Sequence, residues 1–216
     1  MIVRERMTPN PFTITTDMSV PDALHLMREK NMRHLPVLDA HGKLVGIVAE
    51  LDLLYASPSP ATSLSLWELP ELLSKLKVTK VMSTNLATVT EDTPLEEAAR
   101  IMSTRKIGAL LVVRGEELVG IITETDMFRA FLQLLGGLRS GVRVSARTSG
   151  AKGTVAKITN AIFNADGDIV GLGFSEVPQG NELQWHITIK VKDVPLQKLV
   201  EVLKPVVLEI LNVREM

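Results

Sequence analysis

The chain has 216 residues, of which 45% are hydrophobic and 23% are charged, and this excludes a disordered or fibrous protein. Its 24 Lys and Arg residues nearly balance its 25 Asp and Glu residues, so no basic surface for nucleic acid or for an anionic membrane is expected. The absence of cysteine excludes thiol catalysis, zinc thiolate sites and disulfides. Because no signal-like or membrane-spanning apolar run is found, we expect a cytoplasmic protein.

An internal duplication dominates the first part of the sequence. Residues 7–56 align with residues 82–130, with one deletion near Ala40, and 16 of the 49 aligned pairs are identical. The densest match joins Leu44–Ile47 to Leu118–Ile121, and a Glu and an Asp follow at equal spacing in each copy. Identities at this density indicate a repeated domain and not a shared composition.

Each copy predicts the same order of elements. Ser19 in the first copy and Thr93 in the second precede an acidic residue three places on, with a Pro nearby, which is typical of a helix N-terminus. Two short apolar runs separated by a turn follow each helix. A second helix is expected from about Asp52 and from about Asp126. With a short strand before the first helix, each copy is predicted to be β-α-β-β-α.

The duplication sets the domain boundaries. The first copy is expected at residues 1–56 and the second at residues 81–135. Between them, residues 57–80 begin with two Ser-Pro pairs and continue with apolar residues on one side of a helical pattern, which predicts a helical linker. A Gly-Gly pair opens an expected hinge at residues 136–141.

Residues 142–216 have a different pattern. The expected elements are a strand from 142, a helix at 153–165, strands at 168–174 and 183–191, a helix from about Pro195, and a strand at 206–213. This β-α-β-β-α-β order predicts an open antiparallel sheet with two helices on one face.

Two strings carry a resemblance to a known family. Arg33–Val37 reads RHLPV and Gly120–Asp126 reads GIITETD, and with the tandem repeat they resemble a pair of cystathionine-β-synthase (CBS) domains, known as a Bateman module. The C-terminal region resembles an ACT domain, and the order CBS, CBS, ACT is similar to the acetoin-utilization protein family. The resemblance implies an α+β (mixed α/β) chain, with two CBS units packed as a pseudo-twofold pair and a ferredoxin-like ACT domain.

The CBS resemblance implies adenosyl ligands in clefts between the two units. In the motif G-h-x-[S/T]-x-x-D, the Asp binds the ribose hydroxyls and the Ser or Thr lies near the phosphate, and Gly120, Thr123 and Asp126 match this motif. The first copy keeps Asp52 but has Ala49 in place of the hydroxyl residue. A helix N-terminus suits a phosphate, and an ionised Asp accepts from vicinal hydroxyls. We therefore expect the second site to be the stronger one.

Both groups of candidate residues have an explanation that needs no ligand. Thr123 and Asp126 are also spaced as a capping box. The retention of Asp52 where its capping partner is absent favours a further role for the Asp. Arg33 and His34 stand just before an apolar strand, where the family places basic residues near ligand phosphates; the alternatives are an exposed strand-entry pair or a hydrogen-bonded core histidine.

Weaker candidates lie elsewhere. Thr13 and Ile14, and their counterparts Thr88 and Val89, stand on the first strand of each copy and could contact an adenine, or could serve only as β-branched sheet formers. In the ACT-like region the turn before the helix keeps Gly153, a possible effector loop, but lacks the acidic residue of the family. Gly153 could equally shape only the turn.

No enzyme signature accompanies these features. The four histidines lack metal-ligand spacing, and no nucleophile-elbow or P-loop string is present. We expect no catalytic residue, no metal and no cofactor beyond an adenine nucleotide (AMP, ADP or ATP) as regulatory ligand. The predicted function is a homodimeric sensor acting on its ACT-like domain or on a partner enzyme, with acetoin catabolism suggested by the family. The alternatives are a dimerisation module with empty clefts and an amino-acid sensor.

Overall fold

The computed structural model describes residues 1–56, 75–179 and 182–216. Contacts divide the chain into an N-terminal unit, Met1–Met127, and a C-terminal unit, Phe128–Met216. No helix among the described residues is long and apolar enough to cross a membrane. Most of the linker expected at 57–80 lies outside the described residues.

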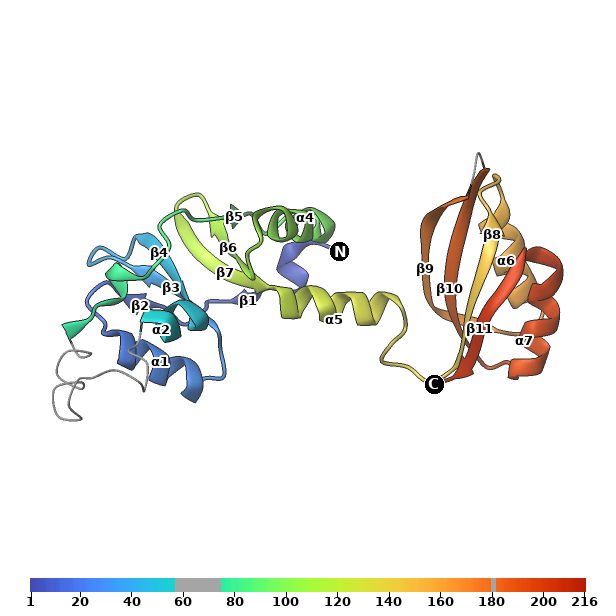
Figure 1. The fold of residues 1–216 in the computed structure, drawn as a ribbon, viewed down its shortest axis with the longest axis horizontal. Coiled ribbons are helices and arrows are strands. Elements are labelled where there is room, and N and C mark those ends of the chain that lie inside the picture. Colours follow the sequence, from blue (N-terminus) through green and yellow to red (C-terminus); the bar gives the residue numbers. More distant parts are fainter. Residues whose placement is uncertain (57–74, 180–181) are drawn as a thin grey trace. The chain divides into compact units, whose positions relative to one another are not determined.

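The two copies have the predicted order of elements (Figure 1). The first copy contains β2 (Ile14–Thr15), α1 (Val20–Glu29), β3 (His34–Leu38), β4 (Leu44–Ala49) and α2 (Glu50–Ala56). The second contains β5 (Thr88–Val89), α4 (Leu95–Arg105), β6 (Ala109–Arg114), β7 (Glu117–Thr123) and α5 (Glu124–Leu134). The mixed α+β class and the repeated β-α-β-β-α order are confirmed.

The starts of the two leading helices differ in how they are capped. Ser19 caps α1 as predicted, because its hydroxyl accepts a hydrogen bond from the Asp22 N–H at 3.2 Å. The equivalent prediction for Thr93 was wrong. Helix α4 begins after Pro94, and the Thr93 hydroxyl accepts instead from the Thr90 N–H at 3.1 Å. Thr93 therefore stabilises the turn before the helix and not the helix itself.

The copies exchange the segments that precede their first strands. The first copy forms a three-stranded sheet, β2-β3-β4, whereas the second forms a four-stranded sheet, β1-β7-β6-β5, in which β1 (Thr8–Pro9) comes from the N-terminus. In the equivalent arrangement of the other copy, Ser83 forms an antiparallel bridge with Ile47 on β4. Each copy thus extends the sheet of the other, which is consistent with the expected pseudo-twofold packing.

A methionine on each exchanged segment lies over a glycine of the other copy. A Cβ at Gly120 would lie 2.6 Å from the Met7 sulfur, and a Cβ at Gly46 would lie 2.5 Å from the Met82 sulfur. Such distances leave no room for a side chain. Gly120, which the motif made a candidate ligand residue, is therefore required by the packing of Met7.

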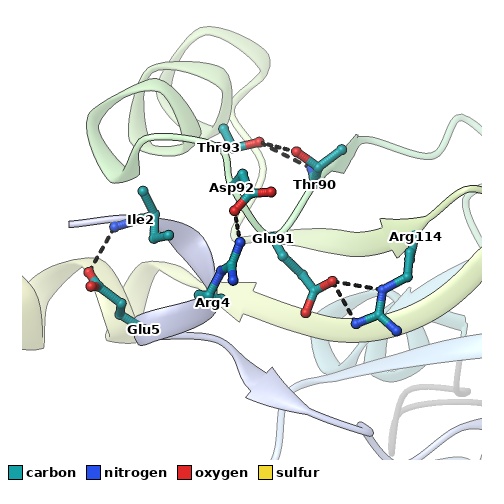
Figure 2. Close-up of polar contacts among 8 residues, drawn as sticks. All are labelled: Ile2, Arg4, Glu5, Thr90, Glu91, Asp92, Thr93 and Arg114. Carbon is teal, nitrogen blue, oxygen red and sulfur yellow. Dashed lines mark hydrogen bonds and ion pairs between the residues drawn. The ribbon is translucent and has the colours of Figure 1, made fainter.

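Figure 2 shows how the N-terminal segment is held on the second copy. The 3-10 helix η1 (Val3–Glu5) places Arg4 in an ion pair with Asp92. Next to Asp92, Glu91 pairs with Arg114 at 2.8 Å. Beneath these exposed ion pairs the Val3 N–H donates to the Thr93 carbonyl at 2.9 Å. Surface ion pairs contribute little, so the buried valine is the main anchor.

The second exchanged segment repeats this attachment on the first copy. The 3-10 helix η2 (Val78–Lys80) begins with Val78, whose N–H donates to the Met18 carbonyl at 3.0 Å. Both Val3 and Val78 are 0% exposed. The two valines therefore occupy equivalent positions in the two attachments.

Truncation of Val3 is expected to destabilise the second copy, which it contacts, and truncation of Val78 is expected to destabilise the first. Val3→Ala and Val78→Ala should each cost about 2 kcal/mol, because two buried methyl groups are replaced by a cavity. Hydrogen exchange should show the loss of protection in β6 and β7 for Val3→Ala and in β3 and β4 for Val78→Ala. A loss of protection confined to the valine's own copy would contradict the exchange of segments between the two copies.

The C-terminal unit is a four-stranded antiparallel sheet with two helices on one face (Figure 1). Its elements are β8 (Val142–Ser149), α6 (Thr154–Phe163), β9 (Asp168–Gln179), β10 (Glu182–Lys192), α7 (Leu196–Leu203) and β11 (Glu209–Glu215). The strand order β11-β8-β10-β9 with this βαββαβ connection is the ferredoxin-like arrangement. Alternate residues of β8 are buried, so one face of the sheet packs on the helices and the other is open.

The segment after α5 packs on β9. A Cβ at Gly171 would lie 2.2 Å from the backbone carbon of Leu135, and a Cβ at Gly173 would lie 2.7 Å from the Leu135 side chain. The sequence predicts close packing or a bulge from this Gly-x-Gly, and both are present, since the β10 register shifts between Lys190 and Val191. Contacts accordingly place the unit boundary after Met127, before the hinge expected at 136–141.

Candidate functional site

A cavity of about 630 Å³ lies between the two copies of the N-terminal unit. The first copy contributes Arg33, His34, Ile47, Glu50, Asp52 and Leu54 to its wall. The second copy contributes Ser83, Asn85, Lys106, Ile107, Leu111 and Glu124. The volume and the mixture of apolar walls with a few charged groups suit a ligand of nucleotide size.

The charged residues of the cavity are of both signs. Arg33 and Lys106 are exposed cations, one from each copy, and Asp52 is an exposed carboxylate in the first turn of α2. The Asp52 carboxylate accepts no hydrogen bond from the part of the chain that the structure describes. An ionised carboxylate in this state can accept from two neighbouring hydroxyl groups, and the two cations can pair with an anionic group.

Arg33 links the two copies at the rim of the cavity. Its guanidinium donates to the Thr125 hydroxyl on α5 at 3.1 Å, and its carbonyl accepts from the Glu50 N–H at 2.9 Å. The second copy repeats the backbone part of this arrangement, because the Glu124 N–H donates to the Gly108 carbonyl at 3.0 Å. The strand-entry segments therefore hold the starts of α2 and α5.

His34 is an uncharged polar group in the wall at neutral pH. Burial lowers the pKa of its imidazole below the ordinary value of 6.5, and Arg33 lowers it further, while the Glu124 and Asp52 carboxylates oppose the shift. The ring lies against Gly108, where a Cβ would be 3.3 Å from its Cε1 and Nε2 atoms. The absence of a side chain at this position makes room for the imidazole.

The motif of the second copy has the geometry of a helix cap. The Thr123 N–H and hydroxyl both donate to Asp126 Oδ2, at 2.9 and 2.7 Å. Neither residue is among those that line the cavity. Asp126 is therefore engaged within the protein, whereas the equivalent Asp52 is available to a ligand. The cavity brings together Arg33, His34 and Asp52 among the predicted site residues.

The remaining candidates lie away from the cavity wall. Ile14 and Val89 are 2% and 7% exposed and pack inside their own copies, while Thr13 and Thr88 are exposed. Gly153 precedes α6 with a φ of +87°, a left-handed backbone that favours glycine, and a Cβ there would meet no atom within 4 Å. The backbone accounts for Gly153 without a ligand, and its effector role stays a prediction.

Sequence reasoning missed the cavity residues that come from the second copy's strand-entry segments. Ser83 and Asn85 belong to the exchanged segment, and Lys106 stands in the left-handed C-cap of α4, with a φ of +55°. No spacing along the chain connects them with Asp52. The duplication was the available signal, because it aligns Lys106 and Gly108 with the Asn31 to Arg33 segment already singled out for its basic residue.

Three solved structures are similar to the part of the chain that forms this cavity. The AcuB protein of Vibrio cholerae, assigned to acetoin utilization, is 36% identical with a TM-score of 0.51, and the match covers 62% of this chain and 92% of that one. CBSX2 in complex with AMP is 37% identical with a TM-score of 0.50, covering 61% and 96%. The CBS domain pair of protein MJ0100, in complex with 5'-methylthioadenosine and S-adenosyl-L-methionine, is 29% identical with a TM-score of 0.52, covering 64% and 98%.

Some relatives carry the matched region within a larger protein. L-aspartate semialdehyde sulfurtransferase of Methanocaldococcus jannaschii is 30% identical over 133 residues, which are 60% of this chain but only 23% of the enzyme. The shared region is thus only a part of this enzyme.

The family model of the CBS domain matches the chain twice, at residues 3–59 and 78–133, which together make up more than half of it. The two matches begin at Val3 and Val78, the valines that anchor the exchanged segments. The exchange is therefore part of the repeated domain, and the chain belongs to the CBS domain family.

Proposed function

We propose that this chain is a non-catalytic regulatory protein that binds an adenine nucleotide, AMP, ADP or ATP, in the cavity between its CBS copies. The observation that carries the proposal is the Asp52 carboxylate, which accepts no hydrogen bond from the described residues and lines the same cavity as Arg33 and Lys106. A nucleotide needs an acceptor for its ribose diol, cations for its phosphate and apolar walls for its base. The AMP and S-adenosyl-L-methionine complexes of similar CBS pairs support an adenosyl ligand.

The proposal assigns the stronger site to the first copy, contrary to the expectation from the motif. A nucleotide at Asp126 would compete with the two hydrogen bonds from Thr123, whereas a nucleotide at Asp52 displaces no bond within the described protein. The missing hydroxyl at Ala49 removes one phosphate donor, and Arg33 and Lys106 compensate for it by charge.

The C-terminal unit is proposed to act as an ACT-like domain that receives the ligand state or passes it to a partner enzyme. Its ferredoxin-like strand order supports this, and the similarity to AcuB suggests a role in acetoin catabolism in the cytoplasm. A homodimer is proposed because several large apolar side chains on α2 and α5 are exposed: Leu51, Leu54, Tyr55, Phe128, Phe131 and Leu134.

A ligand panel tests the proposal on the whole chain. AMP, ADP, ATP, S-adenosylmethionine, NAD and common amino acids are each added in a thermal unfolding assay. An adenine nucleotide at 100 times its dissociation constant should stabilise the fold by ~2.7 kcal/mol, a rise of several degrees. If no adenosyl compound raised the unfolding temperature, the alternative of a dimerisation module with empty clefts would be favoured instead. A shift with an amino acid alone would move the site to the C-terminal unit.

A further inference from the structure

The open face of the C-terminal sheet carries a row of cations. On β8, the residues that alternate with the buried ones face away from the helices, and Arg143 is one of them. The strand register places Arg143 directly opposite Lys190 of β10 on one side and Arg214 of β11 on the other. Arg143, Lys190 and Arg214, here named the basic row, thus cross three neighbouring strands side by side.

No carboxylate belongs to the row within the described residues. The position next to Lys190 on β9 is Gly171. The acids at the ends of this face are already paired, Glu209 with Arg147 and Asp168 with Lys192 at 3.0 Å. His186, opposite Arg147, is a further titratable group of the face among the side chains that the structure describes. Like charges directly opposite each other on a sheet are destabilising, so the row carries a repulsion that no described carboxylate relieves.

Lys190 is the most unusual member of the row. It is 3% exposed, yet it makes no hydrogen bond or ion pair with any part of the chain that the structure describes. Within the described ranges, its neighbour Arg143 donates to the Thr188 hydroxyl alone, at 3.5 Å. The Lys190 ammonium nitrogen is not among the buried side-chain atoms that lack a partner, so this end of the side chain is accessible to water or to an anion. An anion bound against Lys190 would relieve the repulsion along the row.

The neighbouring residues add what an anion site needs. In the next row of the open face, the Ser145 and Thr188 hydroxyls lie 3.2 Å apart and can both donate to an oxyanion. On the β9 side, the backbone of Leu135 covers Gly171 and closes the end of the row. Hydroxyl donors therefore lie on one side of the basic row, and the Leu135 backbone closes another side.

We infer that the basic row binds a small multivalent anion, a metabolite that carries phosphate or several carboxylate groups. The anion lies over Arg143 and Lys190, with Arg214 at the exposed end. This site is distinct from the nucleotide cavity, since it lies in the C-terminal unit. It gives that unit a ligand of its own, which the proposed nucleotide function does not require.

Calorimetric titration of the full chain with pyrophosphate, and separately with citrate, tests the inference. Binding is expected for at least one probe, and it should weaken as the ionic strength rises. Lys190→Met and Arg143→Gln should each weaken binding by about tenfold or more, because each removes a charge-assisted contact. Lys157→Gln, which removes one charge at an exposed position of α6, is the matched control and should not change the affinity for the anion. Arg33→Gln removes a cation of the nucleotide cavity, and the part of the binding that depends on Lys190 and Arg143 should persist in this variant, which separates the row from the cavity.

Thermal unfolding without added anion gives a second readout. Lys190→Met keeps the apolar stem but removes a charge that the neighbouring cations repel, so its midpoint should equal or exceed that of the wild type. Adding the bound probe should then stabilise the wild type and not the variant. A structural lysine would behave in the opposite way, with a lower midpoint for Lys190→Met. Absence of binding by both probes, or unchanged affinity in Lys190→Met and Arg143→Gln, would overturn the inference.

Discussion

Asp52→Asn is expected to weaken AMP binding by about tenfold or more, measured by calorimetric titration of the full chain. The reason is that a hydrogen bond to a charged acceptor contributes ~1.5 to 3 kcal/mol, and ~1.4 kcal/mol corresponds to a factor of ten. Asparagine has the same shape, but its amide nitrogen cannot accept from a ribose hydroxyl. Because Asp52 is exposed and makes no hydrogen bond within the described protein, the variant should unfold at the wild-type midpoint.

Asp126→Asn is the matched control, since it makes the same change at the equivalent position of the second copy. Here the carboxylate holds the Thr123 N–H and hydroxyl. Loss of such a cap should lower the free energy of unfolding by about 1 kcal/mol, while binding to the Asp52 cavity stays unchanged. If Asp126→Asn abolished AMP binding and Asp52→Asn did not, the site would lie where the sequence motif alone predicts it.

The contrast between Asp52 and Asp126 shows what the sequence motif can and cannot predict about the ligand site. Spacing along the chain gives Asp126 and its hydroxyl neighbour two roles, a capping box and a ligand site, because both need the same residues at the same separation. The side-chain geometry favours the cap. In the first copy, Ala49 cannot supply the hydroxyl, and the Asp52 carboxylate accepts no hydrogen bond from the residues that the structure describes.

The order of elements could be predicted because it depends on local patterns. Apolar runs, turns and the repeat predicted the five elements β-α-β-β-α of each copy, but not β1, η1 or η2. The alternation in residues 142–216 predicted the antiparallel sheet. The failure at Thr93 was also local, since Pro94 took the capping position and the hydroxyl was drawn to Thr90. Helix ends are decided by competition among neighbours, which a single spacing does not resolve.

Contacts between distant segments could not be predicted in this way. The exchange of the segments around β1 and Ser83 depends on which sheet edge each one meets, and either edge accepts an extended segment. The basic row is a similar case. Arg143, Lys190 and Arg214 come from three strands that are far apart in sequence, and only the register of β8 with β10 and β11 aligns them.

Gly171→Ala is expected to lower the free energy of unfolding of the C-terminal unit by about 1–3 kcal/mol, the usual range for an overpacked site. An added Cβ would lie 2.2 and 2.4 Å from the Leu135 backbone carbon and oxygen and 2.5 Å from the Gly136 nitrogen. These atoms cannot rotate away, so the segment after α5 must lift from β9. Hydrogen exchange should accordingly accelerate from Leu135 to Arg139, and the urea midpoint should fall.

Gly173→Ala is the matched control for this clash. A Cβ there would meet only Leu135 Cδ2, at 2.7 Å, and the end of a leucine side chain can change rotamer. Neither glycine has a positive φ, so alanine is allowed at both positions and should also stabilise by ~0.4 to 1 kcal/mol through the unfolded chain. Gly173→Ala should therefore be close to neutral. Equal losses in the two variants would mean that the backbone of Leu135 does not rest on Gly171.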